Sequence, residues 1–96
     1  MKFRLYVVVD REDESVVEDV KSELSKLNST LSFSPSREQP SLAGCLEFFC
    51  TGHGDPDSLL NALNNDWDGD KEDCSAYGFN TKMFHPHVYY LQFQIF

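Results

Sequence analysis

The chain has 96 residues, of which 41% are hydrophobic and 14% aromatic, a composition typical of a folded globular protein. This length is enough for one hydrophobic core and too short for two, so we expect a single domain over residues 1–96. Sixteen acidic and eight basic side chains give a formal net charge of −8. Surfaces that bind nucleic acid or anionic membranes need an excess of Lys and Arg, so this charge argues against both as direct ligands.

The amino-terminal residues and the cysteines indicate the compartment. The first ten residues alternate in charge and apolar character, unlike the basic start and apolar run of a secretory signal. No segment approaches the roughly 20 apolar residues that a membrane helix needs. Cys45, Cys50 and Cys74 leave one thiol unpaired in any disulfide scheme, and Cys45 and Cys50 are expected on opposite faces of one strand. We therefore expect a soluble cytoplasmic protein with reduced thiols.

The amino-terminal third predicts a strand followed by an amphipathic helix. Apolar residues first recur at every second position, at Phe3, Leu5, Val7 and Val9. They then recur at helical steps, at Val16, Val17, Val20, Leu24 and Leu27. Ser15 and Glu18 have the spacing of a capping box, while Asp10 or Asp13 could start the helix earlier. Asn28 is a suitable stop for this helix.

The middle of the chain predicts an edge strand and then a central strand. Leu31 and Phe33 alternate with serines, and Pro35 and Pro40 then bracket a loop that cannot continue a ladder of backbone hydrogen bonds. Residues 42–50, LAGCLEFFC, form a nearly continuous apolar run with one charged residue. Such a run is typical of a strand in the middle of a sheet.

The last part of the chain predicts a second helix, an irregular segment and a final strand. Asp55 and Pro56 have the character of an N-cap and a first helical residue. Apolar residues follow at helical spacing, at Leu59, Leu60, Leu63 and Trp67. Gly69 lies where such a helix would stop, and residues 68–84 are expected to be irregular. The closing strand alternates, with one face made of Tyr89, Leu91, Phe93 and Ile95.

The resulting order is strand, helix, strand, strand, helix, strand. This is the order of the ferredoxin-like α+β sandwich, an antiparallel four-stranded sheet with two helices on one face. Right-handed crossovers place both helices on the same face and leave the other face open. The open face would carry Tyr6, Val8, Glu47, Phe49, Tyr90 and Gln92. It is a candidate binding surface, unless residues 68–84 or a second subunit cover it.

The negative charge is concentrated in two segments. Residues 10–23 carry −5 and residues 55–73 carry −6, whereas the rest of the chain carries +3. Within residues 66–73, DWDGDKED, acids alternate as in the first part of a calcium loop. Lys71 occupies the glycine position of that loop and Tyr77 occupies the position of its bidentate glutamate. A solvated or partner-facing acidic loop is therefore the preferred interpretation.

Other patterns that suggest metal binding or catalysis are weak. Cys50 with His53, and His85 with His87, have spacings that zinc ligands can use, but no Cys-x-x-Cys or His-Glu-x-x-His pattern anchors a site. The sequence also has no glycine-framed nucleophile, no thiol in an electropositive setting and no glycine-rich phosphate loop. We expect no catalytic residues, no resident metal and no cofactor.

Two short stretches resemble families with the ferredoxin-like fold. Residues 5–10, LYVVVD, resemble the first strand of the small CRISPR spacer-acquisition endonucleases, which would imply metal binding by Asp10; an aspartate is also an ordinary turn former at a strand end. Residues 5–7 resemble the first strand of RNA-recognition motifs, in which an aromatic residue of the open face stacks on a base. Cys45 and Glu47 stand where that family has further stacking aromatics, which disfavours RNA.

The composition and charge pattern favour a protein-binding module. Acidic loops attract a basic surface at long range, and aromatic side chains pack against it at short range. We expect an inhibitor of the immunity-protein type that neutralises a basic partner such as a nuclease toxin, with neither nucleic acid nor membrane as its ligand. The alternatives are a homodimeric ferredoxin-like module of unknown ligand and a metal-dependent nuclease using Asp10. The expected partner-binding residues are Asp66, Trp67, Asp68, Asp70, Glu72, Asp73 and Tyr77.

Overall fold

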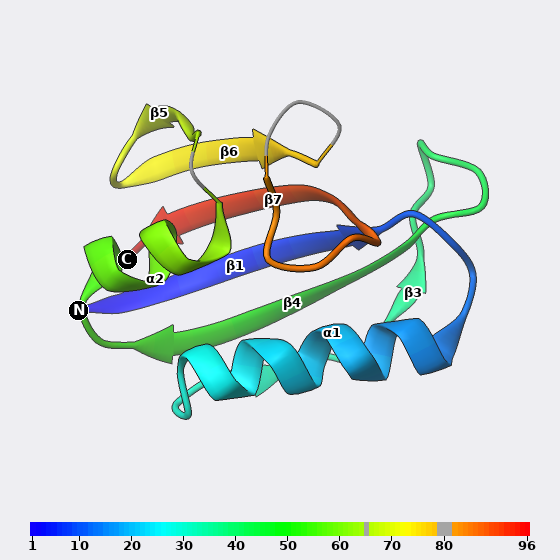
Figure 1. Ribbon diagram of the computed structural model, residues 1–96, viewed down its shortest axis with the longest axis horizontal. Coiled ribbons are helices and arrows are strands. Elements are labelled where there is room, and N and C mark those ends of the chain that lie inside the picture. Colours follow the sequence, from blue (N-terminus) through cyan, green and yellow to red (C-terminus); the bar gives the residue numbers. More distant parts are fainter. Residues whose placement is uncertain (65, 79–81) are drawn as a thin grey trace.

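Two helices and seven strands make up the computed structural model, which describes residues 1–64, 66–78 and 82–96. In chain order they are β1 (Lys2–Val9), α1 (Glu14–Leu27), β2 (Ser32–Phe33), β3 (Arg37–Glu38), β4 (Leu46–His53), α2 (Pro56–Leu63), β5 (Asp68–Asp70), β6 (Asp73–Tyr77) and β7 (Val88–Ile95). The strands form one antiparallel sheet in the order β2-β4-β1-β7-β6-β5, and β3 also pairs with β4 (Figure 1). The α+β class is confirmed, whereas the sheet has seven strands in place of the expected four.

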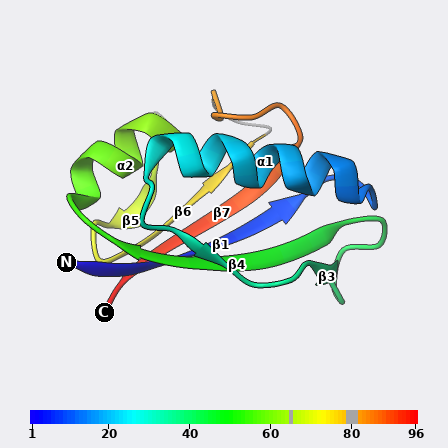
Figure 2. The same ribbon diagram turned by 90° about the horizontal axis from the view of Figure 1, so that it is seen from below.

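Strand β1 lies at the centre of the sheet, and both helices cover the same face (Figure 2). It pairs with β4 along its whole length and with β7 from Phe3 to Val9, with an irregularity in the β7 pairing at the carboxyl end. Alternate β1 side chains point toward the helices and are fully buried, because an extended strand sends successive side chains to opposite faces. The core that they share with the helices includes Leu5, Val7, Val17, Val20, Leu24, Leu59, Leu60 and Leu63.

Helix α1 begins directly after Asp13, which is its N-cap. The Asp13 carboxylate accepts hydrogen bonds from the Ser15 backbone N–H at 2.9 Å and from the Ser15 hydroxyl at 2.7 Å. This satisfies a donor that the first turn of a helix leaves without a partner. Of the alternatives that the sequence offered, Asp13 is therefore the cap, and not the capping box of Ser15 and Glu18. The expected stop at Asn28 is confirmed, since Asn28 still donates its N–H to the Leu24 carbonyl at 3.0 Å but has an extended backbone, with φ of −151°.

Helix α2 starts as expected and ends sooner than expected. Asp55 is its N-cap and Pro56 its first residue, but the helix stops one turn before Trp67. Asn64 has an extended backbone, with φ of −160°, and forms an isolated β-bridge with Met83, so the helical hydrogen bonds cannot continue. Neither helix in the described part of the chain has the length and apolar character that crossing a bilayer requires.

The third expected strand is shifted along the chain. Residues 42–50 were expected to form it, but β4 begins at Leu46, because a turn occupies the residues before it. In that turn Gly44 has a φ of 80°, and the Cys45 N–H donates to the Leu42 carbonyl at 3.2 Å. Cys45 therefore lies outside the strand that contains Cys50, and the expectation that the two share one strand is wrong.

The segment 68–84 is not irregular throughout, since it contains the hairpin of β5 and β6. Cys74 and Ala76 on β6 are buried, and the residues next to them are more exposed, which is the alternation of a strand. Both side chains are small and follow a run of acids, so their apolar period is weak in the sequence. The hairpin extends the sheet beyond β7. A further two-residue strand, β3, lies between Pro35 and Pro40, where only a loop was expected.

The N-cap of α1 provides a test of where this helix starts. The substitution Asp13→Ala removes the acceptor of the Ser15 N–H, and we expect the free energy of unfolding to fall by about 1 kcal/mol. The control Glu12→Ala removes a neighbouring exposed carboxylate and should change the unfolding free energy by less than about 0.5 kcal/mol. Urea denaturation at neutral pH measures both. Equal losses in the two variants would mean that charge near the helix start matters and the cap does not.

Candidate functional site

A strip of aromatic side chains crosses the open face of the sheet, opposite the helices. Tyr6 on β1 lies directly across from Phe49 on β4, with ring centroids 4.9 Å apart. On its other side, Tyr6 lies 6.1 Å from Tyr90 on β7, and Tyr90 lies 4.9 Å from Tyr77 on β6. All four rings are partly accessible to solvent, and Tyr77 is 41% exposed. We call Phe49, Tyr6, Tyr90 and Tyr77 the aromatic strip.

The strand register bears out the residues that were expected on the open face. Because Leu5 and Val7 face the helices, the alternate β1 positions and their partners on β4 and β7 face the other way. Val8 and Glu47 are nevertheless buried, at 1% and 3% exposure. Of the described part of the segment 68–84, the hairpin of β5 and β6 lies beside β7, and Met83 and Phe84 contact the end of α2 on the helix side, so neither part covers this face (Figure 2). The open surface is thus aromatic and polar in its centre.

Glu47 is a buried carboxylate that holds the segment around β3 onto the sheet. Its two oxygens accept a hydrogen bond from the Tyr6 hydroxyl and one from the Arg37 Nε, each at 2.5 Å. The Gln39 amide donates to the Tyr6 hydroxyl at 3.3 Å. Burial alone would raise the pKa of Glu47, but the hydrogen bonds from Tyr6 and Arg37 and the charge of Arg37 bring this pKa below its ordinary value. Glu47 is therefore ionised, and Arg37 neutralises its charge.

Tyr6 takes part in both the aromatic strip and this polar network. Burial and the hydrogen bond to Glu47 raise the pKa of the Tyr6 hydroxyl, so the hydroxyl stays protonated and donates. Its ring remains at the surface between Phe49 and Tyr90. The Glu47 contact therefore sets the position of the central ring of the strip.

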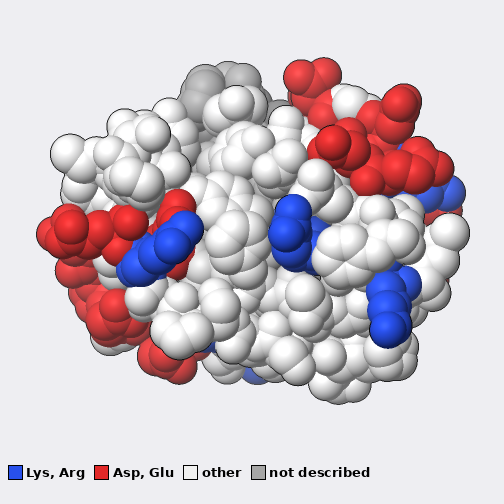
Figure 3. All heavy atoms as spheres, turned by 180° about the vertical axis from the view of Figure 1, so that it is seen from behind, with Lys and Arg blue, Asp and Glu red and all other residues white. Residues whose placement is uncertain are grey.

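Arg4 brings a positive charge to the open face. Its guanidinium carbon lies 5.4 Å from the ring centroid of Phe49 and 5.9 Å from that of Phe96. Its Nη2 donates to the side-chain oxygen of Gln94 at 2.5 Å. Figure 3 shows this side of the molecule, where Lys and Arg lie within a mostly uncharged surface and Asp and Glu gather toward its opposite ends. The face thus already holds one guanidinium against its aromatic rings.

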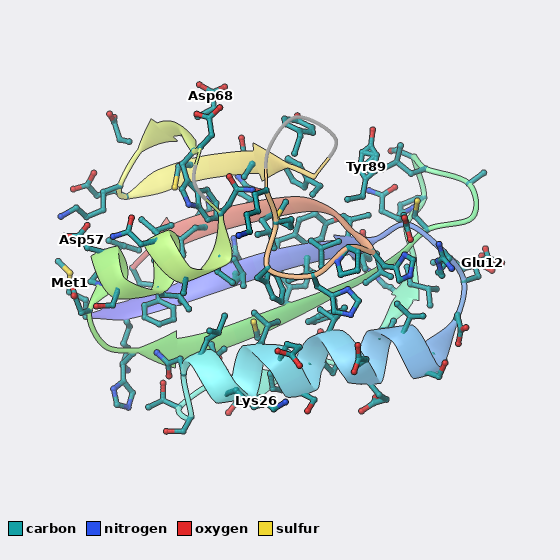
Figure 4. The ribbon with its side chains drawn as sticks, in the orientation of Figure 1. Met1, Glu12, Lys26, Asp57, Asp68 and Tyr89 are labelled. Carbon is teal, nitrogen blue, oxygen red and sulfur yellow. The ribbon has the colours of Figure 1, made fainter. Side chains whose placement is uncertain are left out.

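The hairpin of β5 and β6 forms the outer edge of the sheet beside the aromatic strip. We call residues 68–73 the acidic hairpin. Its register places Asp70 directly opposite Asp73 and Asp68 opposite Ser75, which lies on the open side of the sheet. Carboxylates directly opposite each other destabilise a strand pair, so this arrangement has a cost in stability. In Figure 4, Asp68 projects outward from the sheet edge at β5.

The one basic residue of the acidic hairpin does not neutralise it. Lys71 in the turn forms an ion pair with Asp57 on α2, with an N–O distance of 3.2 Å. Within the described residues, no ion pair involves Asp68, Asp70 or Glu72. The negative charge of the hairpin is therefore directed to solvent.

The structure places the seven expected partner-binding residues in different surroundings. Asp68 and Asp70 flank Gly69, which pairs with the buried Cys74. Asp73 and Tyr77 alternate with Cys74 and Ala76, which are buried, and Glu72 lies in the turn. Asp66 is exposed just before β5. Trp67 packs against the hydrophobic core, and its Nε1 donates to the Leu60 carbonyl at 2.9 Å. Trp67 thus has a packing role, and Tyr77 is the aromatic residue of this set that joins the strip.

Of the residues that suggested a zinc site, His85 and His87 lie together, with ring centroids 5.8 Å apart, whereas Cys50 and His53 have different surroundings. Cys50 is buried in the core, whereas His53 is exposed at the far end of β4. His85 is buried, and its Nδ1 accepts the His87 backbone N–H at 3.1 Å. The other ring nitrogen of His85 must then carry the proton, which it donates to the Asp19 carboxylate at 2.7 Å. This pair attaches the segment before β7 to helix α1.

Asp10, the residue that the endonuclease resemblance singles out, is exposed at the end of β1. Its carboxylate lies 3.1 Å from the Arg11 Nε and 3.4 Å from the His87 Nδ1. Across the described ranges, no group of three or more His, Cys, Asp and Glu side chains is arranged to hold a metal ion.

The three thiols have environments that disfavour the reactive thiolate. Burial raises the pKa of Cys50 to about 12 and that of Cys74 to about 11. Burial and the nearby acids Asp10 and Glu12 also raise the pKa of Cys45. All three cysteines are unpaired.

No family model, curated protein or solved structure matches the chain. Function is therefore inferred from the open face and the acidic hairpin. Sequence reasoning expected Phe49, Tyr6 and Tyr90 on the open face but did not include them among the partner-binding residues. It expected Tyr77 to bind a partner but did not place it on this face, and it missed Arg4. The signal available for these residues was their alternation with the buried side chains of the same strands.

The Glu47 network predicts a specific dependence of stability on pH. Since the pKa of Glu47 is lower in the folded chain, the carboxylate stabilises the fold above its unfolded pKa, and this contribution disappears as the pH falls through the folded pKa. We expect Glu47→Gln to lower the unfolding free energy at pH 7 by about 2 kcal/mol, because two hydrogen bonds to a charged acceptor are weakened. The variant should also lose less stability than the wild type between pH 5 and pH 3.

Glu38→Gln is the matched control for this experiment, because Glu38 is an exposed carboxylate on β3. Urea denaturation at a series of pH values should show little effect of Glu38→Gln at pH 7. If both variants have the same pH profile, the Glu47 network does not stabilise the fold.

Gly69 is required by the close approach of the two strands of the acidic hairpin. It has a φ of 111°, and a Cβ at this position would lie 2.6 Å from the Asp73 carbonyl oxygen. Gly69→Ala should therefore open the hairpin, and we expect faster hydrogen exchange of the β5 and β6 amides. Gly44→Ala is the control, because Gly44 has a φ of 80° with no atom within 4 Å of its Cβ position. Unchanged exchange in Gly69→Ala would contradict the close approach.

Proposed function

We propose that the chain is an acidic protein-binding module that inhibits a basic partner, as an immunity-type protein inhibits a nuclease toxin. The carboxylates of the acidic hairpin would take the place of nucleic-acid phosphates on the partner's surface. The main support is the opposition of Asp70 and Asp73 in a strand pair, with Lys71 turned away to Asp57. Charges held together at a cost in stability are expected where a partner uses them.

The aromatic strip supplies apolar contact surface, which the carboxylates lack and which tight binding needs. An exposed ion pair contributes only about 0.2–1 kcal/mol, so carboxylates alone give steering and weak affinity. Burial of aromatic side chains at the centre of an interface contributes more, and Tyr77, at the other end of β6 from Asp73, pairs with Tyr90 and can supply such contacts. The partner would thus meet the acids first and pack on the rings afterwards.

We infer that β1, β2, β4, β7 and the two helices form a ferredoxin-like unit. Helix α1 connects β1 and β2, which have β4 between them. The connection from β4 to β7, which have β1 between them, contains helix α2 followed by the β5 and β6 hairpin. Two split strand-helix-strand units of this kind support the inference. The acidic hairpin is then an addition at the β7 edge, which fits a role in recognition more than one in the core.

The acidic hairpin can be tested by removing its charge. We expect the wild-type chain, immobilised, to retain a basic protein that elutes as salt is raised, because exposed charges are screened over about 10 Å at 0.1 M salt. The variant Asp68→Asn, Asp70→Asn, Glu72→Gln, Asp73→Asn should bind the purified partner at least about tenfold more weakly by calorimetry. If the partner is a nuclease, a stoichiometric amount of the wild type should abolish its activity.

A control variant with the same change in net charge distinguishes the effect of where the carboxylates lie from the effect of total charge on binding. Glu12, Glu18, Glu23 and Glu38, each replaced by glutamine, neutralise carboxylates outside the hairpin. This control should keep its affinity within about twofold of the wild type. Equal losses in both variants, or binding that salt does not weaken, would contradict the proposal.

A further inference from the structure

The open face already shows how it accepts a cationic side chain. Arg4 has its guanidinium carbon 5.4 Å from the Phe49 ring centroid and 5.9 Å from that of Phe96, and it is oriented by a hydrogen bond to Gln94. Cations are attracted to the face of an aromatic ring, and arginine adds planar stacking to that attraction. The aromatic strip continues from Phe49 across the sheet to Tyr90 and Tyr77, at the side where the acids lie.

We propose that the aromatic strip binds arginine side chains of the basic partner. This inference rests on the proposed function and specifies the chemistry of the partner's contact segment. Guanidinium groups would stack on Tyr77 and Tyr90, and further cationic groups would meet the acidic hairpin. Asp73 and Tyr77 lie on the same side of β6, four residues and roughly 13 Å apart, so an extended segment with alternating arginines reaches both.

Charge complementarity favours this occupant over two others. A second copy of the chain would bring another net charge of −8 against a face whose opposite ends are acidic. A nucleic-acid strand would place its phosphates near Asp68, Asp70 and Asp73. A basic protein segment is attracted by the same carboxylates, while its arginines pack on Tyr77 and Tyr90.

The test compares two blocked peptides of equal charge, Arg-Gly-Arg-Gly-Arg and Lys-Gly-Lys-Gly-Lys, by nuclear magnetic resonance titration of the full chain at low salt. We expect the arginine peptide to bind about threefold or more tightly, and the Tyr77 and Tyr90 ring signals to shift. The substitution Tyr77→Thr should remove most of this preference. Leu27→Ala is the control, because Leu27 is also exposed but lies on helix α1. Fluorescence of Trp67, the single tryptophan, reports that each variant is folded.

The outcomes separate this inference from the proposed function. Equal affinities for the two peptides, both lost in the neutralised hairpin variant, would overturn the arginine site and leave the acidic module standing. A preference for arginine that survives neutralisation of the hairpin would support the arginine site and count against the hairpin as the source of attraction. Two other outcomes would assign the face to another occupant and overturn the inference. One is that a thymidine oligonucleotide binds more tightly than the arginine peptide, and the other is that sedimentation shows a dimer that Tyr77→Thr dissociates.

Discussion

The pairing of β1 with β4 on one side and β7 on the other is the constraint on which the rest of the structure depends. The β1 side chains that face the helices are completely buried, so β1 cannot slip by one residue without moving Leu5 and Val7 to the open side. The registers of β4 and β7 follow from this burial. The same registers bring Phe49, Tyr6 and Tyr90 into one row, so core packing on one face organises the surface of the other.

The Glu47 network explains how the open face holds a carboxylate near its centre without a net negative charge there. A buried carboxylate requires compensating donors, which Tyr6 and Arg37 provide from two different elements. The negative charge of Glu47 is therefore neutralised by contacts within the protein. The segment around β3 is held at the sheet by the same contacts, which leaves the aromatic strip accessible between that segment and the hairpin.

Negative charge is distributed at the periphery for different reasons. Part of the acid near the start of α1 is structural, since Asp13 caps the helix and Asp19 accepts a hydrogen bond from His85. The acidic hairpin has no comparable structural use for Asp68, Asp70 and Glu72 in the described residues. Net charges of about 2 to 8 in magnitude are enough for the solubility of a small domain, so opposed carboxylates in a strand pair are not needed for it. This difference is why the hairpin supports a binding role.

The sequence by itself determined β1, α1, β7 and the start of α2, because their apolar periods are strong and their caps lie next to them in the chain. It also showed which segment is acidic. The β5 and β6 hairpin could not be predicted, because Cys74 and Ala76 give only a weak period and β6 forms by pairing with β7. The sequence placed Trp67 both in an apolar helical stripe and among the partner-binding residues, and the structure decided for inward packing. Only the tertiary structure decided that Tyr77 joins Tyr6 and Tyr90, since these contacts depend on strand register between residues far apart in the chain.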